Sequence, residues 1–144
     1  MKKILIMGLP GSGKTTLAKM IAGKMKQQGK PVVHFNADEV RENINKDLGF
    51  SVQDRIENAR RFSWLADTVV KGNAYCICDF VCPIPETREA FSPDVTIFVN
   101  TIETSRFADT NKMFIKPSEI SVIEITRWFN ESSEDLDLLI SKLL

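Results

Sequence analysis

The chain has 144 residues, 43% hydrophobic and 26% charged, which suits one compact α/β domain over residues 1–144. Its 19 lysines and arginines balance its 19 aspartates and glutamates. This balance gives no electrostatic basis for nucleic acid or an anionic membrane as the main partner. No apolar stretch approaches the roughly 18 residues of a membrane span. The short apolar run at the N-terminus does not resemble a signal peptide, so we expect the chain in the cytoplasm.

The first predicted element is a strand over Lys3–Met7, followed by a glycine-rich turn and a helix that runs to about Gln28. The turn, residues 8–15, reads Gly-Leu-Pro-Gly-Ser-Gly-Lys-Thr and fits the phosphate-binding pattern G-x-x-x-x-G-K-[ST] in full. A strand before this pattern and a helix after it distinguish a phosphate-binding loop (P-loop) from a chance match. The sequence therefore predicts that the chain binds a nucleoside triphosphate.

The spacing within the loop has a chemical reason. Glycines allow backbone N–H groups to turn inward around a polyphosphate, because no Cβ stands in the way. Lys14 can reach the β- and γ-phosphates, Thr15 can hold Mg²⁺ through its hydroxyl, and the helix N-terminus favours an anion. The residues predicted to bind ATP are Gly8, Pro10, Gly11, Ser12, Gly13, Lys14, Thr15 and Thr16.

The next predicted strand is Val32–Phe35, and a short helix begins at about Glu39. Asp38 lies between the two, where the carboxyl ends of parallel strands face one crevice. We expect Asp38 beside the γ-phosphate, where it can accept the proton of an acceptor hydroxyl or hold a water bound to Mg²⁺. Arg41, one turn further, would face an incoming anion. Capping of the short helix is a second role open to Asp38.

Ser51 and Asp54 resemble a capping box and open a long helix, whose apolar positions recur at helical spacing and predict packing on the sheet. The third strand, residues 75–78, ends at Asp79. An acidic side chain at the end of a buried strand is typical of a Walker B position. We therefore expect Asp79 to hold the Mg²⁺ shell together with Thr15. A turn aspartate without a metal is the alternative.

The remaining elements alternate in the same way. We expect a short helix in residues 83–91, a strand over 95–99, a helix capped by Thr101 and ending near Asp109, a strand over 122–125, and a last helix capped by Ser132 or Ser133. Strands that alternate with helices over short connections predict a three-layer α/β P-loop NTPase fold. Its five-stranded parallel sheet would have the strand order 2-3-1-4-5, by analogy with nucleotide kinases, and helices on both faces.

Three segments, residues 8–18, 36–41 and 48–61, together resemble adenylylsulfate kinase (APS kinase). The third is far more specific than the P-loop, and the likeness runs in order across roughly residues 1–115. The resemblance implies a reaction of sulfate assimilation, in which MgATP phosphorylates the 3′-hydroxyl of adenosine 5′-phosphosulfate (APS). Mg²⁺ is then the cofactor, ATP and a small anionic acceptor are the partners, and a homodimer is expected.

The resemblance also implies acceptor-binding residues. Asp38 and Arg41 match the active-site motif Asp-Gly-Asp-x-x-Arg of the family. Phe50 matches an aromatic residue that stacks on the acceptor adenine, and Arg55 and Asn58 match residues that hold the acceptor nucleotide. Guanidinium groups suit phosphate and sulfate oxygens, and an aromatic face suits a purine. A core position for Phe50 and a solvated helix position for Arg55 are the alternatives.

The chain departs from the family pattern in three places. Asn36 replaces the first aspartate of the active-site motif, and Ala37 replaces its glycine. Residues 81–85 lack an expected arginine, for which Arg88 is a candidate substitute. Beyond Lys112, most of the long lid of the family is absent, together with its second stacking aromatic residue.

Some residues have two open interpretations. Arg106, Lys112 and Lys116, in or near the remaining lid, either neutralise the transferring phosphoryl group or are solvated surface charges. Trp128 either contacts the ATP adenine or packs in the core. His34, inside a strand, is predicted to be packed rather than catalytic.

Two other functions remain open beside APS phosphorylation. The altered residues 81–85 and the short lid favour a kinase for another nucleotide, a sugar or another small hydroxyl compound. Asn36 favours an ATP-binding module without catalysis. Four intact residues argue against the module: Lys14, Thr15, Asp38 and Asp79.

Overall fold

The computed structural model describes residues 1–128 and 134–144 of the chain. In these residues, five parallel strands form one sheet: β1 (Lys3–Met7), β2 (Val32–Asn36), β3 (Tyr75–Asp79), β4 (Val95–Val99) and β5 (Ile123–Ile125). The helices are α1 (Lys14–Gln27), α2 (Ala37–Asn43), α3 (Val52–Lys71), α4 (Pro85–Phe91), α5 (Ala108–Met113) and α6 (Glu134–Leu143). None of these described helices is long and apolar enough to cross a membrane.

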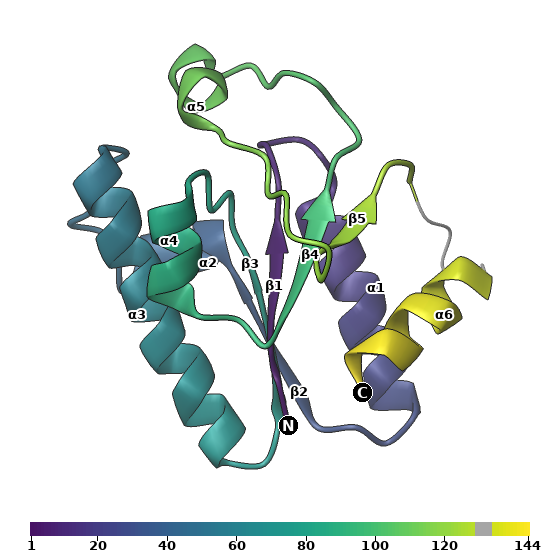
Figure 1. Ribbon diagram of the computed structural model, residues 1–144. Helices are drawn as coiled ribbons and strands as arrows, with labels where there is room; N and C mark the ends of the chain where they lie inside the picture. The colour runs from purple at the N-terminus through teal and green to yellow at the C-terminus, as the bar shows by residue number, and fades with distance from the viewer. Residues whose placement is uncertain (129–133) are drawn as a thin grey trace.

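The strand order is β2-β3-β1-β4-β5, which confirms the predicted order 2-3-1-4-5. Helices cover both faces of the sheet, with α1 and α6 on one face and α3 and α4 on the other (Figure 1). Successive strand residues point to opposite faces, so Ile4 and Ile6 join the core under α1, whereas Leu5 and Met7 join the core under α3. Because both faces are covered, the β1 run is apolar without interruption after Lys3.

Helix α2 begins two residues earlier than predicted. The Asn36 side chain accepts hydrogen bonds from the backbone N–H groups of Asp38 (3.1 Å) and Glu39 (3.2 Å), so Asn36 is the N-cap. The alternative in which Asp38 caps this helix is therefore wrong. Asp38 lies in the first turn instead, with its carboxylate available for another role.

The predicted capping box at the start of α3 forms only in part. Ser51 Oγ accepts a hydrogen bond from the Asp54 N–H at 3.1 Å, as predicted. Asp54 Oδ2, however, accepts from the Gly49 N–H at 2.8 Å instead of returning to the Ser51 backbone. Asp54 thus anchors the loop that carries Phe50 into α3.

The connection between β4 and β5 differs most from the prediction. The helix expected from Thr101 to Asp109 is wrong, because Thr101 Oγ1 donates to the carbonyl of Ser12 at 2.6 Å and does not cap a helix. The chain is irregular up to Phe107, and α5 then lies beyond the carboxyl ends of the strands (Figure 1). The predicted caps of the last helix, Ser132 and Ser133, fall outside the described residues.

Candidate active site

A cavity of about 940 Å³ opens at the carboxyl ends of the strands, the edge where ligands bind in open α/β sheets. It brings together every residue predicted for catalysis, acceptor binding or metal binding, and part of the predicted ATP-binding loop. The predicted residues that line it are Pro10, Gly11, Lys14, Thr15, Asp38, Arg41, Phe50, Arg55, Asn58 and Asp79. The other predicted loop residues, Gly8, Ser12, Gly13 and Thr16, lie outside its lining.

The glycine-rich loop runs tightly between neighbouring segments. At Gly8 (φ +152°), a Cβ would lie 2.5 Å from the carbonyl oxygen of Val99, and at Gly13 (φ +103°) it would lie 2.3 Å from the Trp128 ring. Both positions therefore require glycine. Trp128 lies against the loop with 60% of its surface exposed, so its core position is wrong, and its contact with the adenine stays a prediction.

Lys14 is buried at the start of α1, and its Nζ donates to the carbonyl of Leu9 at 3.0 Å. Burial lowers the pKa of Lys14 to about 8, although the charges of Asp79 and Asp38 act in the opposite direction. Lys14 is thus a cation that lacks a direct ionic partner among the described residues. An anionic phosphate beside it would stabilise its charged form.

A set of mutual hydrogen bonds lies next to Lys14. Thr15 Oγ1 donates to Asp79 Oδ1 at 2.9 Å. Asn36 Nδ2 donates to Thr15 Oγ1 at 2.9 Å and to Asp79 Oδ1 at 3.2 Å. His34 Nε2 contacts the second carboxylate oxygen of Asp79. This role of His34 was not predicted, although His34 and Asn36, two residues apart on β2, share a face of the strand.

These residues fit a magnesium ion bound together with a nucleotide. Thr15 has donated its hydroxyl proton and accepted one hydrogen bond, which leaves it one oxygen lone pair. Oxygen ligands are the ones that Mg²⁺ prefers, and it usually binds one or two protein groups plus phosphates and waters. In the described part of the chain, no cluster of three or more His, Cys, Asp or Glu forms a complete protein cage. The alternative without a metal stays open for Asp79.

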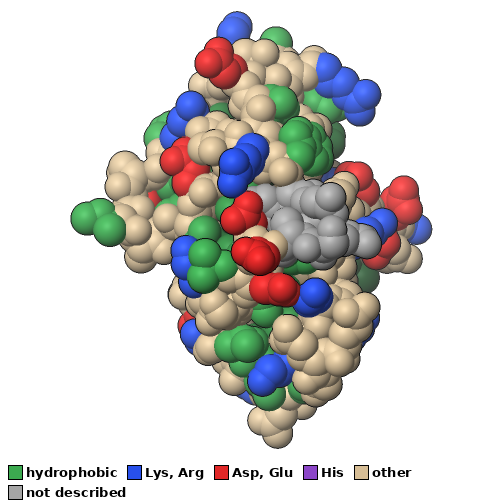
Figure 2. Space-filling view, turned by 90° about the vertical axis from the view of Figure 1, so that its right-hand side faces the viewer, with side chains coloured by type: hydrophobic (Ala, Val, Ile, Leu, Met, Phe, Trp, Pro, Cys, Tyr) green, Lys and Arg blue, Asp and Glu red, His purple; other side chains and the backbone are tan. Residues whose placement is uncertain are grey.

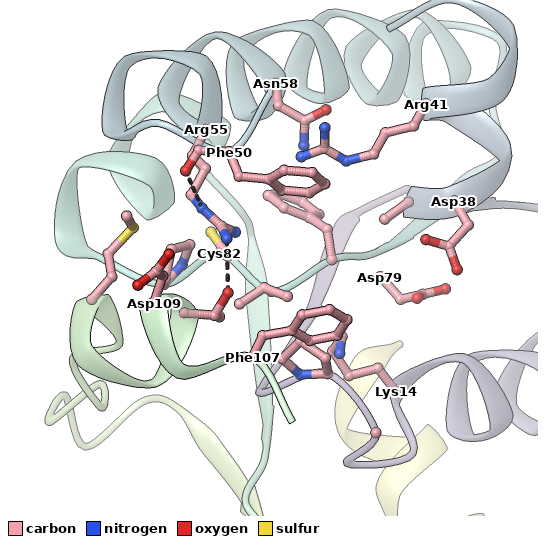
Figure 3. A pocket seen from close by; sticks show the side chains of 18 of the residues that line it. Lys14, Asp38, Arg41, Phe50, Arg55, Asn58, Asp79, Cys82, Phe107 and Asp109 are labelled. Atoms are coloured by element: carbon pink, nitrogen blue, oxygen red, sulfur yellow. Dashed lines mark hydrogen bonds between the residues drawn. The ribbon is translucent and has the colours of Figure 1, made fainter. Parts of the chain in front are cut away.

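Phe50 forms part of the cavity wall opposite Lys14 (Figure 3). It is 64% exposed, so the core alternative for Phe50 is wrong. The guanidinium carbon of Arg41 lies 4.3 Å from the centroid of the Phe50 ring, and that of Arg55 lies 5.5 Å from it. An aromatic face and two cations thus line one side of the cavity.

Both arginines are held by neutral partners. Arg41 Nη1 donates to the carbonyls of Leu48 (3.3 Å) and Gly49 (3.2 Å), and Arg55 Nη2 donates to Thr110 Oγ1 at 3.0 Å. Arg55 is buried, so its solvated alternative is wrong. Burial lowers the pKa of both arginines, and the charge of Arg41 lowers that of Arg55 further. Neither forms a salt bridge within the described residues, which leaves two cations suited to an anion.

Asp38 and Asn58 complete the polar lining. The Asp38 carboxylate lies beside the cavity near Asp79 (Figure 3), and it makes no hydrogen bond or salt bridge with another described residue. Asn58 Oδ1 accepts from Asn45 Nδ2 at 2.8 Å, so Asn58 offers its own N–H groups to the cavity. The site therefore combines a free carboxylate, which can accept a proton, with donors for anionic oxygens.

The segment between β4 and β5 contributes a second aromatic side chain. Phe107 lines the cavity on the side of Lys14, across from Phe50 (Figure 3). This position of Phe107 was not predicted, because the stretch around it was expected to be helical. Of the lid cations, Arg106 lines the cavity, whereas Lys112 and Lys116 do not.

Arg88, the candidate substitute for the arginine missing from residues 81–85, lies outside the cavity lining. Its Nε donates to the carbonyl of Cys82 at 3.2 Å, and its Nη2 contacts the carbonyl of Ile115. The structure thus does not bring Arg88 into the cavity, where a substitute for the missing acceptor arginine would lie. Arg88 instead joins the segment beyond α5, at Ile115, to the segment that follows β3, at Cys82.

The parallel sheet, the P-loop and the free carboxylate of Asp38 in the same cavity as Lys14 define the class of P-loop kinases. Residues 2–126 match the family described as adenylylsulphate kinase, so the chain belongs to this family.

Known relatives extend this assignment. The chain is 32% identical over 114 residues to the adenylyl-sulfate kinase of Halothermothrix orenii, covering 76% of this chain and 62% of that protein. It is 41% identical over 81 residues to that of Chloroflexus aurantiacus, covering 56% and 44%. The chain thus spans only about half the length of such relatives. The structure of the Mycobacterium tuberculosis APS kinase in complex with AMPPNP and APS shares the fold, with a TM-score of 0.85 over 99% of this chain and 96% of that one, at 23% identity.

Proposed function

We propose that the chain transfers the γ-phosphoryl group of ATP to the 3′-hydroxyl of APS. One observation carries this proposal: Arg41 and Arg55, neither in a salt bridge with a described residue, flank the exposed ring of Phe50 across the cavity from Lys14. This wall suits an acceptor with both an anionic group and an aromatic base. APS has both, and the family to which the chain belongs supports it as the acceptor.

On the donor side, the backbone N–H groups of residues 8–15 surround the phosphates of ATP. Lys14 neutralises the charge that spreads over the transferring group, and its position in a buried site strengthens this effect. Thr15 and Asp79 would hold Mg²⁺, which when bound neutralises charge on the β- and γ-phosphates. Phosphoryl transfer needs little covalent chemistry from the protein, so position and charge account for most of the catalysis.

On the acceptor side, Asp38 accepts the proton of the attacking hydroxyl. Its carboxylate is available because Asn36 caps α2 in its place. Arg41, Arg55 and Asn58 hold the anionic groups of the acceptor. Phe50 stacks on its base, and Phe107 gives the cavity a second aromatic wall, in a chain that lacks most of the family's lid.

We further propose that the chain acts as a homodimer in the cytoplasm, with no nucleic acid or membrane partner. The resemblance to the family supports the dimer, and the balanced charge argues against polyanionic partners. Cys76, Cys78 and Cys82 are free thiols, which suits a reducing compartment. Light scattering of the purified chain tests the dimer, and a mass of about one chain would contradict it.

The decisive experiment measures ADP release from MgATP with and without APS, with Lys14→Ala as the blank. We expect release that depends on APS, and a product that mass spectrometry and NMR identify as 3′-phosphorylated. AMP, adenosine and a panel of sugars test the other acceptor classes. If a sugar elicits release and APS does not, the proposed acceptor is wrong. If ATP binds and no acceptor elicits release, the chain is a binding module.

A further inference from the structure

One departure from the family pattern has a structural counterpart. Asn36 stands where the active-site motif has its first aspartate, and this amide is a register partner of Asp79 at the carboxyl ends of the neighbouring strands β2 and β3. Asn36 Nδ2 lies 3.2 Å from Asp79 Oδ1, and each of these two atoms lies 2.9 Å from Thr15 Oγ1. An amide and a carboxylate thus share the hydroxyl group that the P-loop presents.

Asn36, Asp79 and Thr15 form a triangle of hydrogen bonds, and its donors and acceptors determine which side chains can occupy positions 36 and 79. An amide nitrogen only donates, an ionised carboxylate only accepts, and the Thr15 hydroxyl does both. Carboxylates at both 36 and 79 would repel each other at this distance, and amides at both would leave no negative charge. One amide and one carboxylate satisfy all three hydrogen bonds. The same bonds can form with the carboxylate at position 36 and the amide at position 79, or the reverse.

His34 helps to hold the Asp79 carboxylate at the end of β3. Its Nε2 contacts Asp79 Oδ2, the oxygen that Thr15 and Asn36 leave free, and it is the donor when the carboxylate is ionised. The Asp79 side chain is only 2% exposed, and a buried charge needs hydrogen-bond donors. Three side chains from the P-loop and β2 therefore provide donors to both of its oxygens.

We propose that Asp79 on β3 takes the place of the carboxylate that the family motif has at position 36 on β2. Asn36 and His34 are the positioning residues that hold it against Thr15. The inference rests on the proposed function only in that the chain binds ATP with Mg²⁺. Asn36 is then no sign of lost catalysis, because the negative charge beside Thr15 is retained.

An exchange of the two side chains tests this inference. Titration calorimetry measures the Kd of the non-hydrolysable analogue AMPPNP with Mg²⁺ and with EDTA, and the ratio of the two constants gives the gain from the metal. We expect Asp79→Asn to reduce this gain by about 10- to 100-fold. The double variant Asn36→Asp/Asp79→Asn should recover most of it, because it restores one amide and one carboxylate. Aspartate is as good an N-cap as asparagine, so α2 should persist.

Two further variants complete the test. Glu39→Gln removes an exposed carboxylate of α2 and should leave the gain unchanged. Asn36→Asp alone places two carboxylates side by side, so the gain from Mg²⁺ should exceed that of the wild type. If Asp79→Asn keeps the wild-type gain, or if the double variant melts like the wild type yet does not recover it, the inference is overturned. If Asp79→Asn does not fold, the Asn36→Asp result decides, and an unchanged or smaller gain overturns it.

The outcome is separate from that of the acceptor proposal. A wild-type chain that shows the Mg²⁺ gain but does not phosphorylate APS contradicts the proposed function and leaves this inference intact. A wild-type chain whose nucleotide affinity is the same with Mg²⁺ and with EDTA overturns the inference, whatever its acceptor.

Discussion

Arg55 Nη2 donates to Thr110 Oγ1 at 3.0 Å and thereby joins α3 to α5 across the cavity. The Nε of the same guanidinium donates to the carbonyl of Phe50 at 3.1 Å. A guanidinium has five N–H donors, so these two bonds leave others for an anion. Arg55 thus fixes the loop of Phe50 and the short lid segment while it remains able to bind an acceptor.

We expect Arg55→Ala to raise the KM for APS by about 10- to 100-fold, the order expected when hydrogen bonds to a charged group are lost. The KM for ATP should change little, because Arg55 lies across the cavity from Lys14. Steady-state kinetics with each substrate varied in turn measures both constants. Arg60→Ala is the matched control, since Arg60 lies on the same helix, is exposed and pairs with Glu57. Equal effects of the two variants would contradict an acceptor role for Arg55.

Phe50→Leu should raise the KM for APS without loss of stability, because the ring is largely exposed. A base stacked on an aromatic side chain contributes about 1–3 kcal/mol, which corresponds to roughly 5- to 150-fold in affinity. Phe107→Leu should act in the same direction if Phe107 faces the base from the other side. Trp64→Leu, which removes an exposed aromatic ring of α3 outside the cavity lining, is the control. Unchanged acceptor constants in both phenylalanine variants would rule out base stacking here.

The pKa of Lys14, lowered to about 8, predicts how nucleotide binding depends on pH. Below this value the free protein carries the lysine charge that phosphate binding needs, and above it the charge is lost. ATP affinity should therefore fall as pH rises through about 8, by at most tenfold per pH unit. Bound phosphate raises the pKa of Lys14, so binding near this pH should take up a proton.

Calorimetry in two buffers of different ionisation enthalpy measures this proton uptake. Lys14→Arg keeps its charge throughout this range, so its affinity, even if weaker, should not follow the same pH curve. A wild-type affinity that stays constant well above pH 8 would show that Lys14 does not titrate there.

His34→Leu should reduce the gain in AMPPNP affinity from Mg²⁺ by about tenfold, the order expected for one hydrogen bond to a charged group. His34→Gln, which keeps an N–H donor, should retain more of the gain. Both are measured by the titration with Mg²⁺ and with EDTA. The comparison separates a positioning role from simple packing, because a packing role would make the polar glutamine no better than leucine.

The sheet and the P-loop were predictable because their signals are local. Buried parallel strands appear as short apolar runs, and a glycine-rich loop between a strand and a helix has few alternatives. The positions of Asp38 and Asp79 followed from the rule that parallel strands end at one edge of the sheet.

The parts that were not predicted depend on contacts between distant residues. Thr101 has the pattern of a helix cap, yet it bonds to Ser12, 89 positions away, and the predicted helix does not form. Phe107 has no local signal for its role, because other segments form most of the cavity that it lines. His34 shares a strand face with Asn36, but the Asp79 carboxylate that it contacts lies on another strand. Only the folded chain shows which cations of the lid segment reach the cavity.

The oxygen and the nitrogen of the Asn36 side-chain amide form hydrogen bonds with two different elements. Its Oδ1 caps α2, the helix that carries Asp38 and Arg41, and its Nδ2 binds the P-loop hydroxyl of Thr15. If nucleotide binding moves Thr15, the Asn36 amide links that movement to the helix that carries Asp38 and Arg41. We expect the two substrates to bind cooperatively, and reciprocity requires that each change the affinity of the other by the same factor.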